Sequence, residues 1–116
     1  MNENGFRRLA LSLPGASESS HMAHPDFRVG GKIFATLGSP SAGWGMVKLT
    51  LEQQELFGHL DPETFVPAKG AWGRGGATHV KLGTASRSLV RKALLEAWGN
   101  TAPKSLVRKS AGKRGD

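Results

Sequence analysis

The chain contains no cysteine and no long apolar run, and both absences exclude classes of protein. Without cysteine there is no disulfide framework, no thiolate metal site and no cysteine nucleophile. No apolar segment approaches the roughly 20 residues that a membrane-crossing helix needs. Residues 1–5 do not begin a basic-then-apolar secretory signal. We therefore expect a cytoplasmic protein that does not cross a membrane.

Several motifs that carry chemistry are missing as well. The Gly-rich segment 73–76 lacks the spacing of a phosphate-binding loop and leads into a predicted strand rather than a helix. There is no Gly-x-Ser-x-Gly nucleophile elbow. His21 and His24 have no third metal ligand close in sequence, and the acidic residues are scattered. We therefore predict no catalytic residue, no metal, no cofactor and no enzymatic activity.

The length and charge of the chain point to a basic single domain. Its 116 residues are enough to bury a core, and 38% of them are apolar. The net charge of +7 comes from 16 basic and 9 acidic residues. Residues 103–116 hold five of the basic residues and one acidic residue, which leaves a net charge of +3 for the first 102. We predict one domain over residues 1–101 and a basic flexible tail over residues 102–116.

Helical periodicity occurs in three segments. Apolar residues repeat at i, i+3, i+4 and i+7 over residues 6–13, and Pro14-Gly15 ends that helix. Thr50 and Gln53 have the spacing of a capping box, which predicts a second helix that stops near residues 61–62. The predicted apolar stripe of this second helix is Gln53, Leu56, Phe57 and Leu60.

The third predicted helix is capped by Thr84 or Ser86 and stops at Gly99-Asn100. Its apolar stripe consists of Val90, Ala93, Leu94, Ala97 and Trp98.

The clearest strand signal is a hairpin around Gly30-Gly31, a pair that accepts positive φ at both positions. In its return strand, Ile33, Ala35 and Leu37 are predicted to share one face, and Phe34 and Thr36 the other. Further strands are predicted over residues 17–22, 44–49, 64–66 and 78–82, with a Gly-rich loop over 68–77.

Short connections between successive strands predict an antiparallel sheet. The fold class is therefore α+β, with about five strands flanked by about three helices in the order α-β-β-β-β-α-β-β-α.

These features resemble a known family. Leu13-Pro14 is followed by Ser17-Glu18, by the stretch Phe27 to Ala35 (FRVGGKIFA), by Lys48-Leu49 and by the later Pro67, Trp72 and Thr78–Leu82. Over residues 6–99 the chain resembles MmcQ/YjbR-type proteins. The resemblance implies a CyaY-like or secretion-chaperone-like fold and a bacterial, cytoplasmic protein, and it supplies no catalytic residues. Such proteins are often described as DNA-binding because the fold resembles a double-wing module, which is an argument from fold alone.

Basic residues on or beside the strands, with a basic patch on the last helix, predict contacts to nucleic-acid phosphates. Trp44, Trp72 and Phe34 are candidate stacking surfaces. With no helix-turn-helix or zinc-finger signature, the predicted binding to DNA is salt-sensitive and not sequence-specific. The candidate residues are Arg28, Lys32, Lys48, Lys69, Arg74, Lys81, Arg87, Arg91 and Lys92.

A second hypothesis has no role for nucleic acid. Exposed Trp44 or Trp72 would also suit a module that binds a protein partner or a small ligand, with the chain a monomer or a weak dimer.

Overall fold

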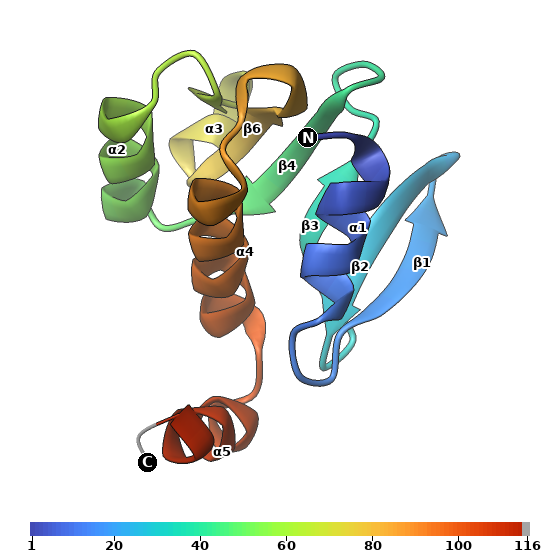
Figure 1. The fold of residues 1–116 in the computed structure, drawn as a ribbon, viewed down its shortest axis with the longest axis vertical. Helices are drawn as coiled ribbons and strands as arrows, with labels where there is room; N and C mark the ends of the chain where they lie inside the picture. Colours follow the sequence, from blue (N-terminus) through green and yellow to red (C-terminus); the bar gives the residue numbers. More distant parts are fainter. Residues whose placement is uncertain (115–116) are drawn as a thin grey trace.

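A computed structural model describes the backbone of residues 1–114 and the side chains of residues 1–109. The chain runs through helices and strands in the predicted α+β order, with two helices added (Figure 1). The elements are α1 (Glu3–Leu11), β1 (Ser17–His21), β2 (His24–Val29), β3 (Lys32–Leu37), β4 (Trp44–Lys48), α2 (Leu51–Leu60), β5 (Phe65–Pro67), α3 (Gly70–Arg74), β6 (Ala77–Lys81), a 3₁₀ turn (Leu82–Thr84), α4 (Arg87–Thr101) and α5 (Lys104–Arg114).

The strands of residues 1–114 form a six-stranded sheet with the order β1-β2-β3-β4-β6-β5. Every neighbouring pair is antiparallel, which confirms the predicted sheet type. The predicted hairpin joins β2 to β3, and Gly30 and Gly31 have φ of 59° and 80°. These angles are in the left-handed region that glycine adopts without strain.

A register shift in the β2–β3 pair changes which side chains β3 buries. Phe27 pairs with Ala35 and Arg28 pairs with Ile33, so Phe34 is the extra residue of a β-bulge. Both Phe34 and Ala35 are fully buried, and Ile33 is partly exposed. The simple alternation predicted for this strand is therefore wrong at Phe34. The same burial removes Phe34 from the candidate stacking surfaces.

Helices α1 and α4 lie together on one face of the sheet and enclose the main core (Figure 1). The predicted stripe of α4 is buried, and the ring of Phe6 on α1 lies 6.1 Å from the ring of Phe27 on β2. The largest fully buried side chains of the described residues are Phe6, Phe27, Phe34, Phe65, Leu37, Met46, Leu82, Leu94, Val29, Val47, Val80 and Val90.

Both predicted helix caps are present. Thr50 Oγ1 accepts from the Gln53 backbone N–H, and the Gln53 side chain accepts from the Thr50 N–H, so the capping box is complete. Ser86, rather than Thr84, caps α4 by accepting from the backbone N–H of Leu89.

The predicted apolar stripe of α2 is wrong in part. Phe57 is buried against Phe65, with ring centroids 5.1 Å apart, but Leu56 and Leu60 are each 55% exposed. Helix α2 packs on the three-residue edge strand β5 and touches α4 only weakly, so it has too little covering surface for its whole apolar side. Gln54 supplies a polar contact to another segment, because its Nε2 donates to the carbonyls of Gly73 and Ala77 at 3.0 Å each.

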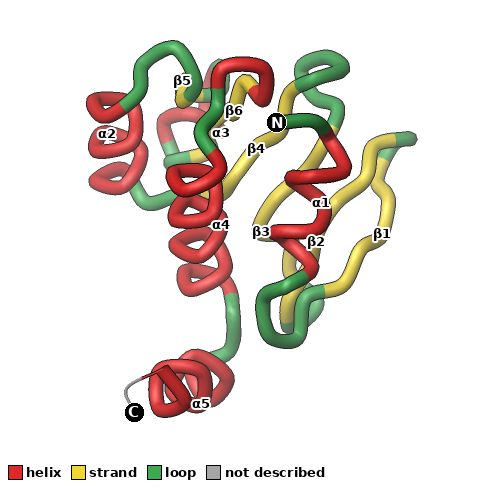
Figure 2. Tube along the Cα trace, in the orientation of Figure 1, coloured by secondary structure: helices red, strands yellow, loops and turns green. Residues whose placement is uncertain are grey.

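Two segments predicted as irregular contain helices (Figure 2). The Gly-rich segment contains α3 (Gly70–Arg74), and the predicted flexible tail contains α5 (Lys104–Arg114). Helix α5 forms where apolar Leu106 and Val107 pack partly buried against the main core, a contact that local composition does not reveal. Residues 115 and 116, which belong to the predicted tail, lie outside the described part of the chain.

Candidate nucleic-acid interface

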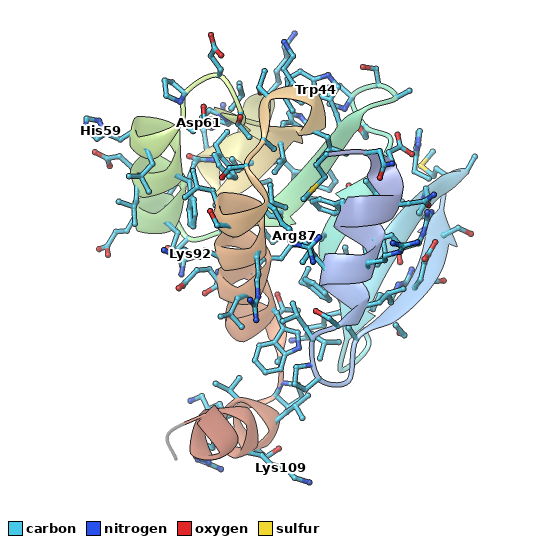
Figure 3. All side chains as sticks on the ribbon, in the orientation of Figure 1. Trp44, His59, Asp61, Arg87, Lys92 and Lys109 are labelled. Atoms are coloured by element: carbon cyan, nitrogen blue, oxygen red, sulfur yellow. The ribbon has the colours of Figure 1, made fainter. Side chains whose placement is uncertain are left out.

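The structure divides the nine predicted cationic residues into three groups. Three line a hollow beside α4, three line a hollow at the β2–β3 hairpin, and three lie outside both. Figure 3 labels Arg87 and Lys92 on α4, which belong to the first group. Sequence order does not show this division, because the second group joins residues from two hairpin strands and β4.

The first hollow lies between the end of α1 and the exposed side of α4 and has a volume of about 680 Å³. Its cations are Arg87, Arg91 and Lys92, all exposed, and their helical spacing brings them to one side of α4. Leu95 and Ser88 complete the contribution of α4. The opposite wall is formed by Ser12, Leu13 and Pro14.

This first hollow is suited to an anion. None of the residues that line it is acidic, and its lining is partly apolar through Leu13, Pro14 and Leu95. Low-dielectric walls concentrate the field of nearby charges, so the three cations attract an anion more strongly here than on a flat, wet surface. The three residues of the opposite wall were not predicted from the sequence, because Pro14 signals only the end of a helix.

The second hollow has a volume of about 410 Å³ and lies where the β2–β3 hairpin meets the ends of β4 and α4. Its cations are Arg28, Lys32 and Lys48. Asn100 at the end of α4 donates to the Lys48 carbonyl at 3.2 Å and to Gln53 Oε1 at 2.7 Å. These bonds hold the end of α4 against β4 and so fix the shape of the hollow.

Arg28 has a structural partner within this second site. Its Nε donates to Asp26 Oδ1 at 2.9 Å and its Nη2 to Asp26 Oδ2 at 3.1 Å. The carboxylate of Asp26 is buried, whereas the guanidinium is about one-third exposed. These hydrogen bonds, and then the negative charge of Asp26, raise the pKa of Arg28 above its usual value. The pair is close to neutral, so the positive potential of the hollow comes mainly from Lys32 and Lys48.

The remaining three candidates line neither of these two hollows. Lys69 precedes α3, Arg74 ends it, and Lys81 ends β6; all three are exposed. Lys81 lies directly across from Trp44 in the β4–β6 pair.

The aromatic candidates differ in exposure. Trp72 is 61% exposed on α3, and Trp44 is half-buried. Figure 3 labels Trp44, which begins β4. The Trp44 ring lies 6.2 Å from the ring of His79, with the two planes at 83°. Within residues 1–109, His79 Nδ1 is buried without a hydrogen-bond partner. Burial lowers the pKa of His79, and the nearby Gly45 backbone opposes this in part.

The histidine pair considered as a metal site is a feature of a turn. His21 and His24 face each other at the end of the β1–β2 hairpin, whose turn residues Met22 and Ala23 have positive φ. Among the described side chains, no group of three or more His, Cys, Asp or Glu residues is placed to hold a metal ion.

Comparison with known families identifies the chain. The sequence pattern of the YjbR family matches residues 11–100. The chain belongs to the YjbR family. The YjbR match contains all nine predicted cationic residues and ends before α5.

A search of curated proteins finds no match to this YjbR-family chain. Within residues 1–114, none of the helices combines the length and the apolar character that a membrane span requires.

Proposed function

We propose that this YjbR-family protein binds DNA through the phosphates, without sequence specificity. The observation that carries the proposal is the grouping of six cationic side chains in two hollows whose linings contain no acidic residue. Five of the six keep their charge unpaired by these linings, and the sixth, Arg28, is bonded to the buried Asp26. Binding of this kind gains free energy from the release of counterions condensed on DNA and does not depend on base sequence.

The proposed role is binding rather than catalysis. The linings of the two hollows offer cations, serines, amides and apolar groups. Neither lining includes a carboxylate or an imidazole that would act as a general base beside a bound anion. Turnover of any substrate by the purified protein in a broad hydrolase and transferase screen would contradict this part of the proposal.

Fluorescence anisotropy with a labelled duplex, at low and high salt, tests the binding. We expect affinity that falls steeply as salt rises. The double variant Arg87→Gln/Arg91→Gln removes two cations from the first hollow. The matched control Lys69→Gln/Arg74→Gln removes the same charge outside both hollows.

Each cation that no longer neutralises a phosphate should reduce the slope of log affinity against log salt by about 0.9. We therefore expect the Arg87→Gln/Arg91→Gln slope to fall by about 1.8, and the control slope to change much less. Equal effects of the two variants would show that net charge alone matters. Absence of binding to a duplex and to a single strand at low salt would end the proposal.

A second candidate function, self-association, has one specific observation in its favour. Five exposed large apolar side chains belong to α2, β5 and α3, and none of them lines either hollow. Exposed apolar surface that is contiguous marks protein–protein contacts. The residues are Leu51, Leu56, Leu60, Val66 and Trp72.

Size-exclusion chromatography with light scattering tests this alternative. Self-association that disappears in Leu56→Glu/Leu60→Glu would support it. A monomer at every concentration would count against it.

A further inference from the structure

The side chains of β4 divide between the two faces of the sheet. A Cβ on Gly45 would meet the Phe6 ring of α1 at 3.0 Å, and Val47 is fully buried, so these two residues face α1 and α4. Because side chains alternate along a strand, Trp44, Met46 and Lys48 face the opposite side. This opposite side, which we call the open face, is not covered by α1 or α4. At its centre Met46 is buried with Ala68 and Ala77, so its accessible parts lie at the Trp44 and Lys48 ends of β4.

Neighbouring strands add to the open face around Trp44. Lys81 pairs with Trp44, and His79 pairs with Met46. The edge contact between the rings of Trp44 and His79 holds the indole in place without a parallel stack. Trp44 keeps part of its surface exposed beside a lysine, which is the combination on which nucleic-acid bases stack.

The charge of the open face favours a polyanion. Lys81 lies at the Trp44 end, and Lys48 of the second hollow lies at the other end of β4, where Arg28 is paired with Asp26. Of the two acidic residues in the described strands, Asp26 faces this side. Its carboxylate is buried and hydrogen-bonded to Arg28. Glu18 of β1 faces the other side, because it pairs with core residue Phe27.

The spacing of these groups suits a strand of nucleic acid. At about 3.4 Å per residue, Lys48 lies about 14 Å along β4 from Trp44. This distance is longer than the rise of about 3.4 Å per nucleotide along one strand of a duplex, so groups at the two ends of β4 would contact different nucleotides of one strand. A base that stacks on an indole must expose its flat face, and the bases of a duplex have both faces covered by their neighbours.

We propose that the open face along β4 binds single-stranded DNA, with one base stacked on Trp44 and phosphates at Lys81 and at the second hollow. This inference rests on the proposed function and narrows its ligand from DNA in general to unpaired DNA at this face. Phosphate contacts then provide most of the affinity, and Trp44 provides the preference for an unpaired strand.

Anisotropy with a labelled oligothymidylate and a labelled duplex tests the proposal in the full-length chain. We expect Trp44→Leu to weaken oligothymidylate binding by about 5- to 150-fold, the effect of removing one base stack, and to leave duplex binding unchanged. The matched control Trp72→Leu removes an exposed tryptophan from α3 and should leave both affinities unchanged. Trp44→Phe should give an intermediate loss for oligothymidylate.

Tryptophan fluorescence gives a second readout that does not depend on Trp44→Leu folding. In a Trp72→Phe background the emitting residues are Trp44 and the buried Trp98. Saturable quenching by oligothymidylate supports stacking on Trp44. Absence of quenching at a saturating concentration of oligothymidylate overturns the stacking.

The outcomes separate the two proposals. Binding of neither probe at low salt overturns the proposed function together with this inference. Duplex and strand binding that are both insensitive to Trp44→Leu overturn the inference alone. If the protein binds oligouridylate but does not bind oligothymidylate, the proposal that the bound strand is DNA is overturned.

Discussion

The indole N–H of Trp98 donates a hydrogen bond of 2.8 Å to the carbonyl of Pro14. The two residues are 84 positions apart, and the bond joins α4 to the turn that follows α1. Pro14 belongs to the wall of the first hollow, so a buried residue of the core holds that wall against the cations of α4. Core packing and the proposed binding surface are therefore coupled at this point.

Replacing Trp98 with phenylalanine should lower the free energy of unfolding by about 1–3 kcal/mol, because the Pro14 carbonyl loses its donor. DNA affinity at the first hollow should fall with it. Urea denaturation measures the first effect, and anisotropy the second. The control Trp72→Phe, at an exposed position, should stay within about 0.5 kcal/mol of the wild type. Equal stability of the two variants would show that the bond contributes little.

The backbone at Gly76 lies so close to the Leu49 carbonyl that a residue with a Cβ atom would not fit at this position. Its φ is +112°, and a Cβ there would lie 1.9 Å from the Leu49 carbonyl oxygen. Gly76→Ala should therefore destabilise the protein by about 2 kcal/mol or more through backbone strain and overlap.

The matched control is Gly99→Ala, at an exposed position of α4 where a Cβ meets open space. It should stabilise the protein by about 0.5–1 kcal/mol through helix propensity. Thermal unfolding of both variants measures the difference, and a harmless Gly76→Ala would contradict the close approach.

His79 should make stability depend on pH in a defined direction. Burial lowers the pKa of the folded-state imidazole below 6.5, so protons bind the unfolded chain more tightly. The contribution of His79 is present above about pH 6.5 and is lost as the pH falls from there towards the lower folded-state pKa. The melting temperature of the wild type should therefore drop more on acidification than that of His79→Gln. Parallel curves for the two proteins would contradict this prediction.

The cations of α5 should add to DNA binding without determining the fold. Lys104, Arg108 and Lys109 are exposed, whereas Leu106 and Val107 make the contacts to the core. Replacing the three cations with glutamine should reduce the salt slope by up to about 2.7, at about 0.9 per neutralised phosphate, with little change in melting temperature. An unchanged slope would show that α5 does not touch the DNA.

Much of the fold follows from short-range sequence signals. The φ freedom of Gly30-Gly31, the capping box of Thr50 and Gln53, and the apolar stripe of α4 predict elements that the structure contains. These signals work because backbone dihedral preferences and capping hydrogen bonds depend on residues only a few positions apart.

Other features were decided by contacts between distant residues. The β-bulge at Phe34 depends on how β3 meets β2, and α5 depends on the burial of Leu106 and Val107 against the core. The exposure of Leu56 depends on the small area that β5 offers to α2.

The candidate site shows the same division between sequence and structure. The sequence alone determined that the protein is basic, lacks cysteine and has nine candidate cations on or beside its predicted strands and on its last predicted helix. Only the tertiary structure gathered six of them in two hollows, paired Arg28 with the buried Asp26, and placed Lys81 beside Trp44. The physical reason is that burial and long-range electrostatics depend on which surfaces meet in three dimensions, and local periodicity carries no information about that meeting.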